Sequence, residues 1–304
     1  WWGVPDMPKI NFESKEARQW ALDVTKYWIE NFNIDGWRMD VAKELDFSFW
    51  KEFRDIAHGA NKDTLLISEI FGDTSQWLQG DRFDGTMNYS FRESMTDYFA
   101  TKRITNKEFA DSLANLYSMY SFEALSSCQN LLSSHDVKRF LNRCGNEKDG
   151  MLGAIFLQAT FPGIAGIYYG DEIGLGGADD PFNREPFPWD DQKSWNLEIL
   201  NYIKNLMKIK RESPIFKYGR FELLNEHNDF VAFRRILKDE SMLCIINREK
   251  SNDDLQIISN AHSINLKFGE CTANLDDGKI KITNNSGDIG LITVSYTHLT
   301  LPTK

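Results

Sequence analysis

Residues 34–44 read IDGWRMDVAKE, which places a cation and a carboxylate two positions apart in an apolar strand. Side chains at positions i and i+2 of a strand leave the same face, so Arg38 and Asp40 are expected to lie side by side. Apolar neighbours such as Ile34 and Ala42 suggest that the pair is buried. A buried ion pair is a weak source of stability, so its presence here points to chemistry.

The sequence around this stretch alternates between strand and helix. Apolar residues at helical spacing predict helices over 14–33, 46–60, 90–101, 106–120, 137–143, 151–160 and 194–212. Apolar runs predict strands over 34–41, 64–72, 82–89, 128–136 and 163–172, and the run at 64–72 is expected to be buried on both faces. Strands that alternate with helices predict βαβ units, and therefore a parallel sheet of the α/β class.

The pattern changes after Ser213. The remaining sequence alternates apolar and polar residues between turn signals, which predicts a small antiparallel β domain. We therefore expect an α/β part over residues 1–213 and an all-β domain over 214–304. The final residues, SYTHLTLPTK, continue poorly from what precedes them. They are interpreted either as a last strand or as an artefact of cloning or assembly.

The composition is that of a globular protein with an acidic surface. Hydrophobic residues make up 41% and charged residues 26% of the 304 residues, and the net charge is −10. Phosphate backbones and anionic lipids repel such a chain, so we expect neither a nucleic-acid nor a membrane partner. No apolar run approaches the length of a membrane span. The four cysteines show no metal-binding spacing and indicate free thiols in the cytoplasm, with disulfides as the open alternative.

Three acidic residues follow predicted strands. Asp40 and Glu69 end two of these strands, and Asp136 follows a third. Each has a structural alternative. Asp40 could serve only to pair with Arg38, and Glu69 could be an ordinary strand-end carboxylate. Asp136 could cap a helix that begins at Val137, since aspartate is a favoured cap. Because the carboxyl ends of parallel strands meet at one face, we expect the three acids to converge there.

Paired carboxylates at one site are typical of glycoside hydrolysis. A retaining mechanism needs an ionised nucleophile and a protonated acid, about 5–5.5 Å apart. Arg38 favours the ionised form of Asp40, which suits a nucleophile. The apolar residues before Glu69 favour its protonated form, which suits a general acid.

Four motifs resemble, in order and spacing, those of the α-amylase family of glycoside hydrolases. They are DGWRMDVA (35–42), SEIF (68–71), LLSSHD (131–136) and GIYYGDEIG (166–174), which are similar to the family's fourth-, fifth-, seventh- and eighth-strand motifs. MPKIN (7–11) further resembles a segment typical of the neopullulanase, cyclomaltodextrinase and maltogenic amylase branch. The resemblance implies the second half of a (β/α)8 TIM barrel, with strands that match the fourth to eighth. A small C-terminal antiparallel β-sandwich domain is expected to follow.

The resemblance also implies catalytic roles. Asp40 would be the nucleophile and Glu69 the acid and base, while Asp136 would stabilise the distorted sugar in the transition state. No cofactor is implied as a requirement. Calcium is used by many relatives, but its usual ligands would lie before Trp1.

Four further residues would bind substrate by the same resemblance. Arg38 and His135 would contact the sugar at the cleavage point, although a lone histidine is more often structural. In DDPFNR (179–184), Asp180 and Arg184 match a family pair that holds the adjacent glucose unit. Three rings could present apolar faces to sugars, although packing explains most aromatic residues: Phe71, Trp77 and Trp189.

These residues predict a retaining hydrolase of α-1,4 and also α-1,6 glucosidic bonds in cyclomaltodextrins, pullulan or maltooligosaccharides. A glucan transferase on the same site is the first alternative, and longer products would reveal it. A non-catalytic amylase-like subunit for binding or assembly is the second, but such proteins tend to lose a catalytic acid. A nucleotide-binding enzyme lacks support because no Gly-rich phosphate loop is present.

The chain also departs from the family pattern. The early barrel strands, with an Asp and an Asn-His pair, would precede Trp1, so open sheet edges are expected to leave this chain unstable or inactive alone. The branch's N-terminal β domain, which commonly supplies a homodimer contact, would lie there too. Lys43 stands where the branch usually has Asn, and Phe71-Gly72 where it has Trp-His. The balance between hydrolysis and transfer is therefore open.

Overall fold

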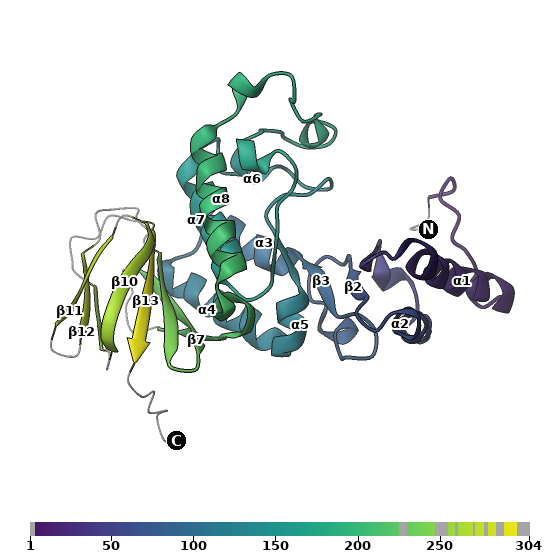
Figure 1. Cartoon of the computed structure of the whole chain (residues 1–304). Coiled ribbons are helices and arrows are strands. Elements are labelled where there is room, and N and C mark those ends of the chain that lie inside the picture. Colours follow the sequence, from purple (N-terminus) through teal and green to yellow (C-terminus); the bar gives the residue numbers. More distant parts are fainter. Residues whose placement is uncertain are drawn as a thin grey trace. The chain divides into compact units, whose positions relative to one another are not determined.

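The computed structural model describes residues 4–224, 230–246, 248, 255–258, 261–269, 271–276, 279–283 and 289–296. Two compact units make up the chain (Figure 1). Unit 1 consists of residues 1–87 and 127–129, and unit 2 of residues 88–126 and 130–304. The domain boundary expected after residue 213 falls inside unit 2 and stays a prediction. The interpretation of the last ten residues falls mostly on 297–304, which lie outside the described residues.

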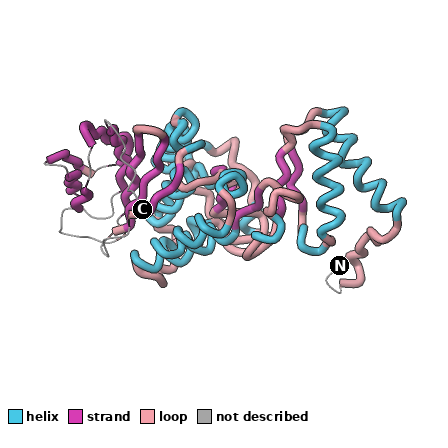
Figure 2. Tube along the Cα trace, turned by 90° about the horizontal axis from the view of Figure 1, so that it is seen from below, coloured by secondary structure: helices cyan, strands magenta, loops and turns pink. Residues whose placement is uncertain are grey.

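Unit 1 alternates strands and helices as the sequence predicts. Its elements are α1 (Lys15–Phe32), β1 (Gly36–Met39), η1 (Ala42–Glu44), α2 (Phe47–Ala60), β2 (Leu65–Ser68), η2 (Ser75–Trp77) and β3 (Gly85–Asn88). The side chain of Ser14 caps α1, and that of Asp46 caps α2. The two helices pack against each other beside the N-terminal end of the chain (Figure 2).

The strands of unit 1 pair in parallel, β1 with β2 and β2 with β3. Gly36 allows the close approach of β1 and β2, because a Cβ atom there would lie 2.2 Å from the Leu65 carbonyl oxygen. In β2, Leu66 and Ser68 are buried while Leu65 and Ile67 are half-buried. The expectation that this strand is buried on both faces was therefore wrong, since only one of its two alternating faces is fully covered.

Unit 2 begins with helices and two short strands. Its first elements are α3 (Tyr89–Met95), η3 (Thr96–Ala100), α4 (Asn106–Met119), α5 (Phe122–Ser127), β4 (Gln129–Leu131), α6 (Phe140–Arg143), α7 (Lys148–Thr160), β5 (Ile164–Gly166), η4 (Asp171–Ile173), η5 (Phe182–Arg184), η6 (Gln192–Ser194), α8 (Leu197–Glu212) and α9 (Pro214–Tyr218). β4 pairs with β5. α7 lies beside α8 (Figure 1). The short helices α5 and α9 were not predicted.

The rest of unit 2 is antiparallel β structure. It contains β6 (Arg220–Leu223), β7 (Val231–Leu237), β8 (Glu240–Ile246), β9 (Leu255–Ile258), β10 (Ala261–Gly269), β11 (Thr272–Asp276), β12 (Lys279–Thr283) and β13 (Ile289–Tyr296). Five strands pair in the order β10-β13-β8-β7-β6, and three in the order β11-β12-β9. Ile280 and Ile282 of the smaller sheet share a buried core with Leu243 and Ile292 of the larger one. The expected β-sandwich is therefore present.

Among the described residues, no helix has both the length and the apolar character that crossing a membrane requires.

Candidate functional site

Asp40 and Glu69 occupy matching positions in unit 1. Met39 pairs with Ser68 at the ends of β1 and β2, and the next residues are the two acids. The backbone N–H of Glu69 donates to the Met39 carbonyl at 2.9 Å. Parallel pairing therefore places both acids at the carboxyl ends of neighbouring strands, as the sequence predicts.

One guanidinium group contacts both carboxylates. Arg38 Nη1 lies 3.4 Å from Asp40 Oδ1, and Arg38 Nη2 forms an ion pair with Glu69 Oε1. Its Nε lies 3.5 Å from Met87 Sδ on β3. The structure thus brings Arg38, Asp40 and Glu69 together. The alternative interpretation, in which Arg38 pairs with Asp40 alone, is therefore incomplete.

The burial of these groups differs from the prediction. The Asp40 side chain is 69% exposed and that of Arg38 36%, whereas that of Glu69 is 4% exposed. The expected burial of the Arg38–Asp40 pair was therefore wrong. The reason is that Asp40 follows the last residue of β1 and lies in the turn that leads into η1. The buried carboxyl group is Glu69.

The two acids therefore lie in different environments. The Asp40 carboxylate is open to water, whereas the Glu69 carboxyl group is enclosed by protein and lies against the Arg38 guanidinium.

A groove of about 620 Å³ opens in unit 1 next to the segment that follows Asp40. The MPKIN segment forms one wall, where Lys9 Nζ donates to the Glu44 carbonyl. The lining residues are Lys9, Ile10, Asn11, Phe12, Glu13, Arg18, Glu44, Leu45, Asp46, Ser48 and Phe49. Its volume lies in the range of small-molecule binding sites.

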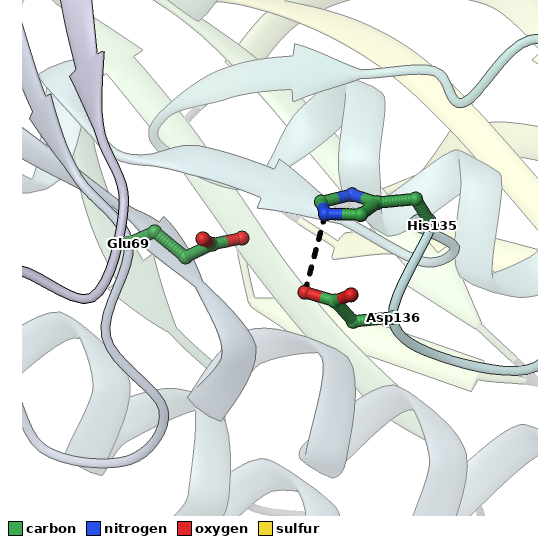
Figure 3. Close-up of side chains that lie close together, drawn as sticks. All are labelled: Glu69, His135 and Asp136. Carbon is green, nitrogen blue, oxygen red and sulfur yellow. Dashed lines mark ion pairs between the residues drawn. The ribbon is translucent and has the colours of Figure 1, made fainter. Parts of the chain in front are cut away.

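In unit 2, the loop after β4 carries His135 and Asp136 (Figure 3). His135 Nε2 lies 3.3 Å from Asp136 Oδ2, and Figure 3 marks this pair with a dashed line. The view also draws Glu69 on the segment that follows β2. Arg184 Nη2 lies 3.5 Å from Asp136 Oδ1. Asp136 is thus held between an imidazole and a guanidinium group.

Asp136 is not a helix cap. The helix after this loop, α6, begins at Phe140, and its N-cap residue is Arg139, without a side-chain cap bond. The backbone N–H of Asp136 donates to Ser134 Oγ at 3.2 Å. The structural alternative for Asp136 is therefore wrong, because α6 begins four residues later.

Arg184 also connects the predicted sugar-binding pair to this loop. Its Nε lies 2.7 Å from Asp180 Oδ1 and donates to the His135 carbonyl at 3.0 Å. The structure thus brings His135, Asp136, Asp180 and Arg184 together in unit 2. The prediction that these four residues form one site with the three of unit 1 stays a prediction.

The sequence analysis missed a buried pair beneath this loop. Arg139 and Asp171, with side chains 0% and 6% exposed, lie 3.2 Å apart from Nη1 to Oδ1. Arg139 also donates to the Tyr169 carbonyl at 2.7 Å. Burial raises the pKa of Asp171 to about 6, against the lowering effect of Ser133 and Arg139. The available signal was the pair of acidic residues, Asp171 and Glu172, in the GIYYGDEIG motif.

The three aromatic candidates differ in environment. Phe71 is 51% and Trp189 68% exposed, so both rings reach the surface, and Trp189 also packs against Phe187 at 4.2 Å between ring centroids. Trp77 is half-buried and packs edge-on against Phe47, at 5.3 Å between ring centroids. For Trp77 the packing interpretation is therefore the better one.

The four cysteines are free and buried. Burial raises the pKa values of Cys128 and Cys144 to about 12. Within either unit taken alone, the described residues include no group of three or more His, Cys, Asp or Glu side chains placed to hold a metal ion.

Comparison with known proteins places these motifs in a family. Residues 2–213 match the model of the alpha amylase catalytic domain. Neopullulanase 2 of Thermoactinomyces vulgaris is 38% identical over 258 residues, which are 84% of this chain and 44% of that protein. The intracellular maltogenic amylase of Bacillus subtilis (strain 168) is 37% identical over 247 residues, which are 80% of this chain and 42% of that protein.

A solved structure gives the same result. A cyclomaltodextrinase superposes with a TM-score of 0.86 at 29% identity, covering 96% of this chain and 51% of that one. The expected fold class, part of a (β/α)8 barrel followed by a β domain, is thus confirmed. The chain spans less than half the length of the curated relatives named above.

Proposed function

Because the chain belongs to the alpha-amylase family, as its match over residues 2–213 shows, we propose that it carries the catalytic acids of a retaining α-glucan hydrolase. The observation that supports this most strongly is the pair of acids at the ends of β1 and β2, with one guanidinium between them. Asp40 is exposed and Glu69 is buried, so their environments separate the two roles.

In the proposed reaction, a carboxylate oxygen of Asp40 attacks the anomeric carbon while the bond to the leaving oxygen breaks. Glu69 gives its proton to that oxygen. Glu69 then takes a proton from water, the water oxygen attacks the anomeric carbon, and the Asp40 ester bond breaks. Two inversions give net retention of configuration. Arg38 holds both carboxylates, and its charge limits the cost of ionising Glu69 after the first step.

We further propose that Asp136 completes this site. Its carboxylate would contact sugar hydroxyls more strongly in the transition state than in the ground state, as transition-state stabilisation requires. Asp180 and Arg184 would bind the adjacent glucose unit. The support is that one Arg184 side chain contacts Asp136, Asp180 and the His135 carbonyl.

The proposed substrates are cyclomaltodextrins, pullulan and maltooligosaccharides. The printed names of the relatives support this class, and so does the groove beside MPKIN, which could hold a sugar unit on the leaving-group side. Glucan transfer is a second candidate, favoured by Lys43 and by the exposed Phe71 next to Gly72. An exposed ring on the leaving-group side could hold an acceptor sugar. Oligosaccharides longer than the substrate would identify transfer.

The experiment that tests this function is Asp40→Asn, made in a protein that also carries the early barrel strands, because this chain is expected to be unstable or inactive alone. Loss of the nucleophile should lower kcat with a maltooligosaccharide by on the order of a thousandfold or more, because no glycosyl-enzyme can form. Asp63→Asn is the matched control, since Asp63 is exposed and lies before β2. Circular dichroism should show both variants folded.

Unchanged turnover in the Asp40→Asn variant would refute the assignment of the nucleophile.

We also propose that the protein works in the cytoplasm without an added cofactor, consistent with the printed name of the Bacillus subtilis relative. We propose in addition that the protein forms a homodimer.

A further inference from the structure

The loop that carries His135 and Asp136 is held mainly by hydrogen bonds between its backbone and side chains of other segments. Residues 132–139 lie between β4 and α6 and belong to neither. Within the loop, the Val137 N–H donates to the Ser134 carbonyl at 3.4 Å. Side chains from other segments bind most of the remaining carbonyl groups, so distant parts of unit 2 fix the shape of the loop.

Arg92 of α3 binds the two ends of the loop. Its Nε donates to the Leu132 carbonyl at 2.8 Å, and its Nη2 to the Lys138 carbonyl at 3.4 Å. Burial lowers the pKa of Arg92. A buried cation that binds both ends of a loop limits the spacing of those ends.

Asn183 binds the middle of the loop. Its Nδ2 lies 2.9 Å from the His135 carbonyl, 3.1 Å from that of Val137 and 3.5 Å from that of Ser134. The side chain is 1% exposed. The reversed amide would place an oxygen against three carbonyl oxygens, so the network fixes which atom is the donor.

Asn183 also lies within the segment that carries the sugar-binding pair. Arg184, the next residue, donates to the same His135 carbonyl at 3.0 Å. Gly177 lets the chain approach this segment closely, because a Cβ atom there would lie 2.5 Å from the Phe182 carbonyl oxygen. The segment 180–184 and the loop 134–137 are therefore connected at several points, and Asn183 makes the most contacts among them.

We propose that Asn183 is a positioning residue, which holds the Asp136 carboxylate in place and couples it to the segment that carries Asp180 and Arg184. The proposal rests on the function proposed above for Asp136. The Asn183 side chain is buried, and its contacts given above are all with the backbone of the loop. It acts through Asp136, so its loss should affect the transition state more than substrate binding.

The first test is the exchange of backbone hydrogens in residues 132–140. In Asn183→Ala, this peptide should exchange roughly tenfold faster than in the unaltered chain, because the loop loses a buried donor. Asn106→Ala is the matched control: Asn106 is buried and accepts from Tyr98 Oη at 2.6 Å, away from the loop. That variant should lose stability and leave exchange in 132–140 unchanged.

The second test is the division between kcat and KM. With a maltooligosaccharide, Asn183→Ala should lower kcat by roughly 10- to 100-fold, because small displacements of a catalytic group are costly. KM should stay within about threefold, since substrate binding is little changed. Asn106→Ala should leave both constants unchanged.

A second variant, Asn183→Asp, tests the same contacts if the Asn183→Ala protein does not fold. Asn183→Asp keeps the volume but replaces the donor with an oxygen that faces three carbonyl groups. Its loop should exchange faster at pH 7, and the ratio to the unaltered chain should fall toward pH 5, where the carboxyl group regains a proton to donate.

The outcomes separate the two proposals. Unchanged exchange in both Asn183 variants overturns the positioning role, and so does faster exchange with unchanged kcat. If the unaltered protein, tested together with the early barrel strands, turns over no α-glucan, the proposed function fails, and the exchange measurement alone decides whether Asn183 holds the loop.

Discussion

Asp171 is a residue whose charge state depends on the fold. In the unfolded chain this carboxyl group loses its proton near 3.8, and in the folded chain burial raises the pKa to about 6. Between these pH values the folded state binds more protons than the unfolded state. Stability from this group is therefore present below pH 4 and is lost as the pH rises to 6.

We predict that Asp171→Asn removes this dependence. The amide does not titrate, so the free energy of unfolding of the variant should gain up to about 3 kcal/mol relative to the original chain between pH 4 and pH 7. Urea unfolding at both pH values measures the difference. Asp149→Asn, at an exposed position on α7, should show no such shift. A constant difference between variant and original chain would contradict the assignment.

At this scale the sequence predicted some contacts and missed others. The period of a strand was enough to place Arg38 beside Asp40. The Arg38–Glu69 contact depends on the register between β1 and β2, which local sequence does not specify. Asn183 was not predicted as a site residue, for a similar reason. Its three acceptors lie more than forty residues earlier, in a loop without a periodic pattern.

At the scale of elements, the C-terminal end of α7 is held by cations from two other segments. Lys210 of α8 donates to the Ala159 carbonyl at 3.0 Å, and Arg235 of β7 donates to the Thr160 carbonyl at 2.8 Å. Arg235 also donates twice to the Gly219 carbonyl, at 2.8 and 3.1 Å. Positive charge at a helix C-terminus is favourable. These bonds connect α7 to the β-sandwich within unit 2.

Arg235→Met should therefore destabilise the protein. Arg235 is 0% exposed, and its loss leaves the Thr160 and Gly219 carbonyls buried without this donor. We expect a loss of about 3 kcal/mol in the free energy of unfolding. Arg220→Met is the control, because that side chain is 47% exposed and its ion pair with Glu222 contributes less than about 1 kcal/mol. Equal effects of the two substitutions, measured by urea unfolding, would contradict this role.

The elements themselves were largely predictable where periodicity was strong. The helix predicted over 106–120 is α4, Asn106–Met119, and the one predicted over 14–33 is α1, Lys15–Phe32. Strands came out shorter than predicted, as with 163–172 and β5, Ile164–Gly166. The apolar run continues past the point where the backbone leaves the sheet. Apolar character reports burial, and strand ends depend on pairing with a neighbour.

At the scale of the whole molecule, the order of motifs carried more information than any one of them. Four strand-end motifs in sequence order predicted the fold class, which the family match and the superposition confirm. The alternation of apolar and polar residues predicted the antiparallel β domain, and the family resemblance implied that it is a sandwich. The exposure of Asp40 was not predicted, because the apolar residues next to it in the sequence indicated burial.

The central claim, that Asp40 is the nucleophile, can be tested by trapping. A maltosyl fluoride with fluorine at carbon 5 of the reacting ring slows both steps, and its good leaving group lets the glycosyl-enzyme accumulate. Digestion and mass spectrometry then locate the label. The account predicts one sugar adduct on the Asp40 carboxylate, absent from the Asp40→Asn variant. An adduct on Glu69 or Asp136, or turnover with inversion at the anomeric carbon, would contradict it.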